Sequence, residues 1–215
     1  MASIEESWKE ATEGLNKSVC DSWLTKLKEM YSQERRTYHN LDSVASKLQR
    51  CQEIKHKLKN PKAVLLTLFF QNFEYDPKDL DGENKNLGHF NTFAEEAGIP
   101  KDSPLLKETQ ALLRIATTHS TDEHKIDGAY GEQDAHYLLD LDMSVLGDNP
   151  DKYAEYREKI RGEYSFLSKT MYTALRLKVL QNFLLIPNIF ATKEFREKYE
   201  DQARANIESE IKYLS

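Results

Sequence analysis

Residues 64–75 read VLLTLFFQNFEY, and this stretch decides the fold that we predict for the chain. Its first seven residues carry no charge and include only one polar side chain, Thr67, which is typical of a helix buried in a core. Gln71 and Asn72 then stand side by side before an aromatic and acidic end. We therefore expect a core helix whose polar end faces a functional site.

Apolar residues on both sides of this stretch recur at three- and four-residue steps, the spacing of one helical face. Leu15, Val19, Trp23 and Leu27 form one such row, and we expect their helix to bury Trp23. Pro61 marks the start of the core helix because proline suits a first helical turn. Helices are predicted from Ser3, over 15–31, 41–58, from 61, 90–97, 104–116, 134–147, 153–160, 175–183 and from 193 onward, with loops over 76–86 and 120–132.

Strand patterns are nearly absent, and the chain shows no internal repeat or heptad run. These observations predict an all-α fold. Nothing in the 215 residues indicates a break between domains, so we expect residues 1–215 to form a single helical domain, with residues 1–35 as an N-terminal helical extension packed on it.

Composition excludes several classes of function. The net charge is −6 and the basic residues are interspersed with acidic ones, which argues against a nucleic-acid surface. The longest apolar run is too short to span a bilayer and the N-terminus has no secretion-signal pattern, so we expect no membrane association and a cytoplasmic protein. Cys20 and Cys51 lie on separate predicted helices without metal-ligand spacing, and we expect free thiols.

Several polar residues stand at or near predicted helix ends in apolar surroundings. Imidazole and carboxylate groups together can hold a divalent ion whose bound water loses its proton near neutral pH. An amide oxygen is a neutral and weaker donor, so the neighbouring amides would not replace such ligands. The candidates are His39, Gln71, Asn72, His119, Asp140 and Asp142.

The order of these motifs resembles the HD-domain superfamily of metal-dependent phosphohydrolases. Arg36, Tyr38, His39 and Asn40 match the family's R-x-Y-H-N pattern, and LLDLDMSVLG over 138–147 matches its L-D-x-D-L element. TTHS around His119 and segments of the C-terminal half are similar as well. The resemblance covers roughly residues 36–210 and implies an HD-type helical bundle with a pocket among the helices near His39, Gln71–Asn72 and Asp140. It identifies Asp140, ahead of Asp142, as the family's last metal-binding carboxylate.

The sequence departs from the family at the residues that would bind the metal. Gln71 and Asn72 stand where the family has adjacent His and Asp, and Ser43 stands where it has a second histidine. The acidic loop that follows is altered around Glu83. Only His39 and Asp140 remain as candidate ligands, too few to hold an ion tightly, so we expect no metal cofactor.

These features together predict a protein that has lost metal-dependent hydrolysis and uses the former pocket to bind a small molecule or a partner. An active phosphohydrolase of nucleotides or other phosphomonoesters, with Mn, Mg, Fe or Zn in a rebuilt site, is one alternative. Metal-free chemistry with His39 or His119 as a general base is another. Arg161, Arg176 and Arg204 could bind an anion, although ion pairing is the more common role. The predicted pocket comprises Tyr38, His39, Gln71, Asn72, Glu83, His119, Asp140 and Arg176.

Overall fold

The computed structural model describes residues 3–79 and 81–215, without the side chain of Glu83. The described residues form helices and connecting turns, and no strand occurs among them. The prediction of an all-α fold is therefore confirmed. Within the same residues, no helix is long and apolar enough to cross a membrane.

The chain divides into two compact units. The first runs to His119 and includes Gln133–Leu138, and the second consists of Ser120–Glu132 and Leu139–Ser215. The helices of the first unit are α1 (Ile4–Ala11), α2 (Lys17–Tyr31), α3 (Leu41–Ile54), the 3-10 helix η1 (Lys55–Lys57), α4 (Pro61–Phe70), α5 (Gly82–Ala97) and α6 (Pro104–Ala116).

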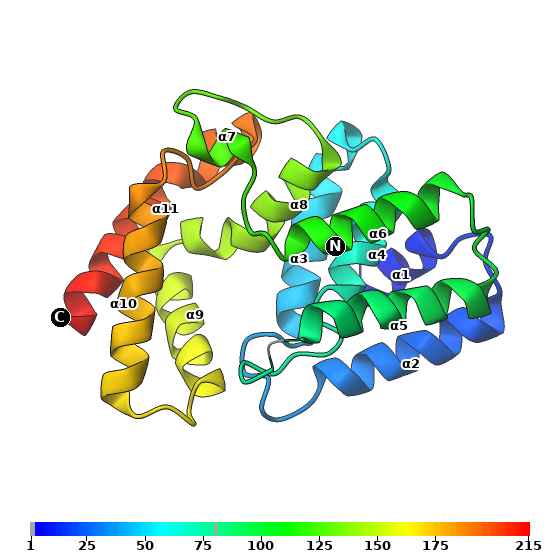
Figure 1. The fold of residues 1–215 in the computed structure, drawn as a ribbon, viewed down its shortest axis with the longest axis horizontal. Coiled ribbons are helices and arrows are strands. Elements are labelled where there is room, and N and C mark those ends of the chain that lie inside the picture. The colour runs from blue at the N-terminus through cyan, green and yellow to red at the C-terminus, as the bar shows by residue number, and fades with distance from the viewer. Residues whose placement is uncertain (1–2, 80) are drawn as a thin grey trace. The chain divides into compact units, whose positions relative to one another are not determined.

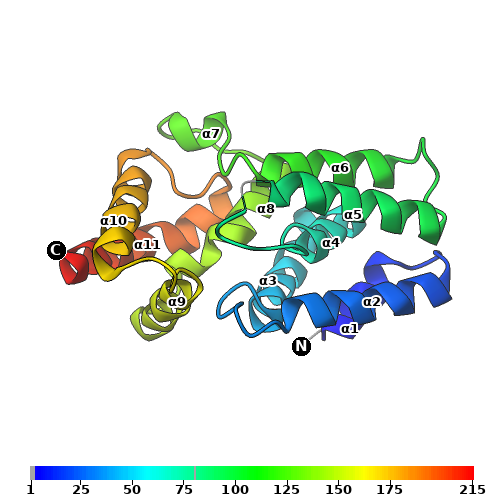
Figure 2. The same ribbon diagram turned by 60° about the horizontal axis from the view of Figure 1, so that its bottom comes forward.

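The first unit is built around α4, in which every side chain from Ala63 to Phe70 is buried. Helices α1, α3, α5 and α6 all contact it, and α5 and α6 run side by side in both views (Figures 1 and 2). A helix that is apolar on all sides must be surrounded in this way to remove its side chains from water. Its aromatic neighbours are Trp8, Trp23 and Phe93.

Residues 1–35 supply part of this core. The Ser3 side chain caps α1 with a capping box to Glu6, as the sequence predicts. Trp8 donates a hydrogen bond from its indole Nε1 to the Cys20 carbonyl at 3.0 Å, and Trp23 donates to a Glu96 carboxylate oxygen at 2.6 Å. Both indoles are buried, so α1 and α2 contribute to the hydrophobic core of the first unit.

Helix α8 (Asp134–Met143) belongs to both units, and the remaining helices lie in the second. Asn149 caps α9 and is followed by Pro150, and Thr192 caps α11. Helix α10 packs along α11 (Figure 1). The helices of the second unit are α7 (Asp122–Lys125), the 3-10 helix η2 (Ser144–Gly147), α9 (Pro150–Glu163), α10 (Lys169–Leu185) and α11 (Lys193–Leu214).

Several predicted helix and loop ranges differ from the structure. The predicted loop over 76–86 ends earlier, because α5 begins at Gly82. The predicted loop over 120–132 contains the single turn α7. The predicted helix over 41–58 changes to 3-10 geometry at Lys55. Gly and Asn residues at 82–86 favour a loop by local propensity, but burial of Asn86 and Phe90 against the first unit's core outweighs that preference.

Both cysteines are free and buried, which confirms the expectation of free thiols. Burial raises the pKa of the Cys51 thiol to about 12. The thiolate form is the nucleophile, so this thiol is inert at neutral pH while the protein is folded.

Gly147 provides a test of packing in the second unit. A Cβ atom there would lie 2.5 Å from the Cβ and 2.8 Å from the carbonyl oxygen of Tyr199, and the backbone oxygen has little freedom to move. We expect Gly147→Ala to lower the free energy of unfolding by about 2 kcal/mol or more, because overpacking of this kind forces backbone shifts. Urea denaturation followed by circular dichroism measures the change.

The control is Gly88→Ala, at an exposed position inside α5 where an added Cβ would meet nothing within 4 Å. It should raise the free energy of unfolding by up to about 1 kcal/mol through higher helix propensity. Equal stabilities for the two variants would contradict the observed packing of Tyr199 against η2.

Candidate functional site

Gln71 and Asn72 lie in the turn that follows α4, with Gln71 as its C-cap residue. Arg36 reaches this turn from the segment between α2 and α3. Its Nη1 donates to the Asn72 carbonyl at 2.7 Å and its Nη2 to the Phe73 carbonyl at 2.6 Å. These two carbonyl groups lie beyond the last residue of α4, outside the hydrogen bonds of the helix, and the buried guanidinium satisfies them. Arg36 therefore fixes the backbone that carries both amides.

Asn86 of α5 holds the same turn from another side. Its Nδ2 donates to the Gln71 carbonyl at 2.8 Å and to the Glu74 carbonyl at 3.1 Å, while its Oδ1 accepts from the Glu74 N–H at 2.7 Å. Three hydrogen bonds from one buried amide satisfy most of its capacity. The backbone from Gln71 to Glu74 is thus held by two buried side chains from distant parts of the sequence.

His39 lies beside this segment. Its ring stacks on the Tyr75 ring with centroids 4.0 Å apart, and the Tyr38 ring meets it edge-on at 4.9 Å. His39 is half-buried and precedes α3, which begins at Leu41 with Asn40 as its cap. Tyr75 follows Asn72 by three residues, so the structure brings Tyr38 and His39 to the segment that carries the two amides.

Asp140 of α8 lies in the second unit and is fully buried. One carboxylate oxygen accepts from the Ala191 N–H at 2.8 Å. The other accepts from the Thr192 N–H at 2.8 Å and the Thr192 hydroxyl at 2.6 Å. Both oxygens are therefore occupied in fastening α8 to the start of α11. Coordination of a metal ion by Asp140 would require the loss of some of these bonds.

Burial raises the pKa of Asp140 to about 7, even though the Thr192 hydroxyl and the two backbone donors favour the charged form. A carboxyl group with such a pKa exchanges its proton near neutral pH. The hydrogen bonds of Asp140 all go to Ala191 and Thr192 of the helical scaffold. Structural networks as well as active sites contain groups with shifted pKa values, so the raised pKa of Asp140 does not by itself mark a catalytic residue.

Arg176 of α10 is engaged in a buried ion pair. Its Nε and Nη2 donate to the two oxygens of Glu210 at 2.8 and 3.1 Å, and the Tyr153 hydroxyl donates to the same carboxylate. Burial beside Glu210 raises the pKa of the Tyr153 hydroxyl, which keeps it a donor. Arg176 would have to leave Glu210 to bind an anionic ligand, and removal of one partner from such a pair is costly.

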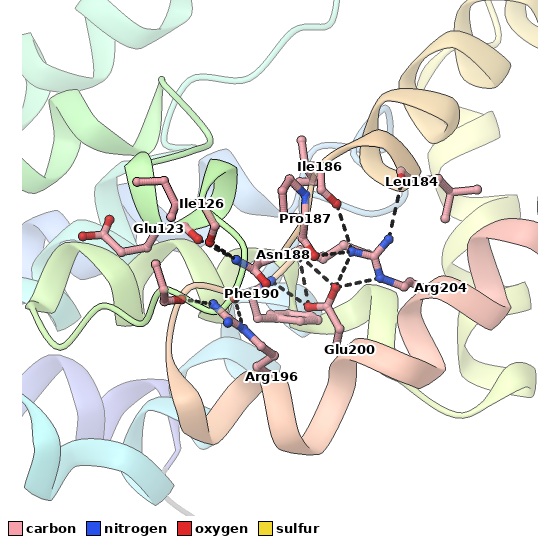
Figure 3. A network of polar contacts seen from close by, with 12 residues as sticks. Glu123, Ile126, Leu184, Ile186, Pro187, Asn188, Phe190, Arg196, Glu200 and Arg204 are labelled. Carbon is pink, nitrogen blue, oxygen red and sulfur yellow. Dashed lines mark hydrogen bonds and ion pairs between the residues drawn. The ribbon is translucent and has the colours of Figure 1, made fainter.

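The chain between α10 and α11 is held by a second carboxylate network, shown in Figure 3. Glu200 accepts from the N–H groups of Ile189 and Phe190, and Arg204 pairs with Glu200 and donates to the Ile186 carbonyl at 3.0 Å. Asn188 also donates to the carbonyls of Glu123 and Ile126, at 2.8 Å each, and so fixes α7. The ion-pair interpretation of Arg176 and Arg204 is thereby confirmed.

The remaining predicted residues are placed as follows. His119 is exposed after α6 and has a φ of 55°, in the left-handed region that non-glycine residues seldom adopt. Asp142 is half-buried at the end of α8. The Glu83 side chain lies outside the described part of the chain. Tyr38, His39, Gln71, Asn72 and His119 belong to the first unit, whereas Asp140 and Arg176 belong to the second.

The sequence did not indicate the residues that shape this turn. Arg36 appeared only as part of a motif, and Asn86 was assigned to a loop. Tyr75 follows the amide pair at a spacing that carries no signal for stacking. A buried arginine is rare enough that its position before a predicted helix could have marked a carbonyl-binding role, but no spacing rule connects Asn86 with Gln71.

Among residues 3–79 and 81–215, no group of three or more His, Cys, Asp or Glu side chains is placed to hold a metal ion. Comparisons of the chain with protein-family models, with curated proteins and with solved structures found no match.

Asp140 provides a test of the electrostatics. In Asp140→Asn the side chain keeps its shape but places an NH₂ group against a backbone N–H, so we expect a loss of about 1 to 3 kcal/mol in the free energy of unfolding. Because the folded pKa lies above the unfolded value, the stability from protonated Asp140 is fully present below about pH 4 and declines up to about pH 7. The advantage of the wild-type chain over the variant should therefore narrow as the pH rises.

Urea denaturation of both proteins at several pH values between 4 and 8 measures this difference. A difference in the free energy of unfolding that widens with rising pH would contradict the raised pKa. It would mean that the hydrogen bonds from Ala191 and Thr192 lower the pKa of Asp140 more than burial raises it.

Proposed function

We propose that this chain is a divergent HD-type helical protein that binds a ligand at the former catalytic position and no longer hydrolyses phosphate esters with a metal ion. The observation that carries the proposal is the state of Asp140. The sequence resemblance selects this carboxylate as a surviving metal ligand, yet both of its oxygens accept hydrogen bonds from Ala191 and Thr192. Asp140 therefore holds the helical scaffold together. Gln71 and Asn72 are neutral, so they add no negative charge that could bind a metal ion in its place.

The ligand-binding part of the proposal rests on the turn after α4. Arg36 and Asn86 hold the backbone of this turn, so the Gln71 and Asn72 side chains start from a fixed position. Amide groups both donate and accept hydrogen bonds, and they can bind a neutral or anionic small molecule without a cation. The neighbouring His39 and Tyr75 rings provide a flat surface for a planar group.

If the proposal is correct, replacing Gln71 and Asn72 by the family's His and Asp should restore affinity for a metal ion. We expect the wild-type chain to contain far less than one metal ion per molecule and to show no turnover of nucleoside monophosphates with added Mn²⁺. Gln71→His combined with Asn72→Asp adds an imidazole and a carboxylate beside His39, and it should raise Mn²⁺ or Zn²⁺ affinity by about tenfold or more. Elemental analysis and metal titration of the purified proteins measure both quantities.

The chain contains its own matched control. Gln181 and Asn182 form a second Gln–Asn pair, exposed on α10, and Gln181→His with Asn182→Asp makes the same chemical change away from the turn. Equal gains in the two double variants would show that the added ligands act non-specifically. Stoichiometric metal in the wild-type protein, together with turnover that disappears in His39→Ala, would instead establish a working phosphohydrolase. Turnover without metal that His39→Ala abolishes would establish metal-free chemistry.

A further inference from the structure

Helix α10 has an exposed apolar row that lies about 100° around the helix from its row of buried residues. Met171, Leu175 and Val179 recur at four-residue steps and expose 60%, 43% and 37% of their surface, and Leu185 at the helix end exposes 80%. Residues four apart are neighbours on one side of a helix, so the first three form a continuous ridge. The ridge lies within the second unit.

The packed side of α10 holds this ridge in place. Tyr172, Arg176 and Leu180 are buried, and Arg176 is tied to Glu210 of α11 through two hydrogen bonds. The Arg161 guanidinium of α9 lies 4.6 Å from the centroid of the Tyr172 ring. Because buried contacts already hold α10 in place, a partner that binds the ridge loses little free energy to ordering of the helix.

The charges of α10 indicate what the ridge would bind. The helix contains Lys169, Arg176 and Lys178 but no Asp or Glu, although the whole chain has a net charge of −6. Arg176 is neutralised by Glu210. Lys169 and Lys178 are exposed and form no ion pair with any residue in the described part of the chain. Lys178 therefore stands next to Val179 and Lys169 at the start of the same helix, and neither cation has a compensating acid among the described residues.

Two occupants are disfavoured by these charges. A second copy that packed its own α10 on the ridge would bring lysines together. In an antiparallel pair centred on Leu175 the two Lys178 residues would lie about 9 Å apart along the axis, close to the Debye length of about 8 Å at physiological salt, so salt screens their repulsion only in part. An anionic membrane surface is usually recognised by four to eight clustered basic residues, roughly twice or more what this helix offers.

We propose that the ridge of Met171, Leu175 and Val179 docks an acidic amphipathic helix of a partner protein, with its apolar row on the ridge and its Asp or Glu residues near Lys169 and Lys178. The apolar contact supplies most of the binding free energy. The lysines select acidic over basic partners and increase the rate of association. This surface is independent of the function proposed for the turn after α4.

Two synthetic helical peptides test the proposal. Both carry leucines at i, i+4 and i+8, and these are flanked by glutamates in one peptide and by lysines in the other. Fluorescence anisotropy with the full-length chain should show that the glutamate peptide binds about tenfold or more tightly than the lysine peptide. Leu175→Gln should weaken binding of the glutamate peptide by about tenfold. Lys178→Glu should remove or reverse the preference for the glutamate peptide over the lysine peptide.

Two variants are matched controls. Ile126→Gln removes an exposed apolar side chain elsewhere in the second unit, and Lys212→Glu makes the same charge reversal on α11. Neither should change the affinity ratio by more than about twofold. Circular dichroism confirms that all variants are folded.

Three outcomes would overturn the proposal. The first is equal affinity for the two peptides, or a preference that Lys178→Glu leaves unchanged. The second is a dimer in sedimentation experiments that Leu175→Gln converts to a monomer, which would assign the ridge to a second copy of the chain. The third is binding to phosphatidylserine vesicles that Leu175→Gln abolishes, which would assign it to a membrane surface.

Discussion

The structure of the first unit depends on the complete burial of α4. A helix whose side chains from Ala63 to Phe70 are all inaccessible to water needs protein on every side, and α1, α3, α5 and α6 provide it. The turn that follows α4 places the carbonyl groups of residues 71–74 against the buried side chains of Arg36 and Asn86. Those groups must then be satisfied by side chains, because an unpaired buried carbonyl costs free energy comparable to a lost hydrogen bond. Arg36 and Asn86 meet this requirement, and in doing so they fix the position of Gln71 and Asn72.

The second unit uses buried carboxylates for a similar purpose. Asp140 binds the start of α11, Glu200 binds the backbone of Ile189 and Phe190, and Glu210 binds Arg176 and Tyr153. Each carboxylate joins segments far apart in sequence or holds an irregular segment in place. The carboxylates of Asp140, Glu200 and Glu210 remain tolerable in their positions because each accepts hydrogen bonds from charged or polar donors.

This structural use of acidic residues changes how the motif residues are interpreted. Asp140 and Arg176 have the residue types of a phosphate or metal site, yet both are engaged by their own unit. His39 stacks on Tyr75, three residues after the amide pair, and the carboxylate of this turn, Glu74, hydrogen-bonds to His89. Amide and aromatic groups can hydrogen-bond to a ligand and stack on it, and this chemistry is the basis of the proposed function.

The sequence by itself determined the helical class, the buried character of α4 and its start at Pro61, the start of α1 at Ser3, and the free thiols. These features follow from periodicity, local capping chemistry and composition, which act over a few neighbouring residues. Tertiary structure alone decided the start of α5, the stacking of His39 on Tyr75 and the partners of Arg36, Asp140 and Arg176. Hydrogen bonds between residues 34 to 52 positions apart leave no periodic trace in a sequence, because their partners are selected by packing rather than by spacing.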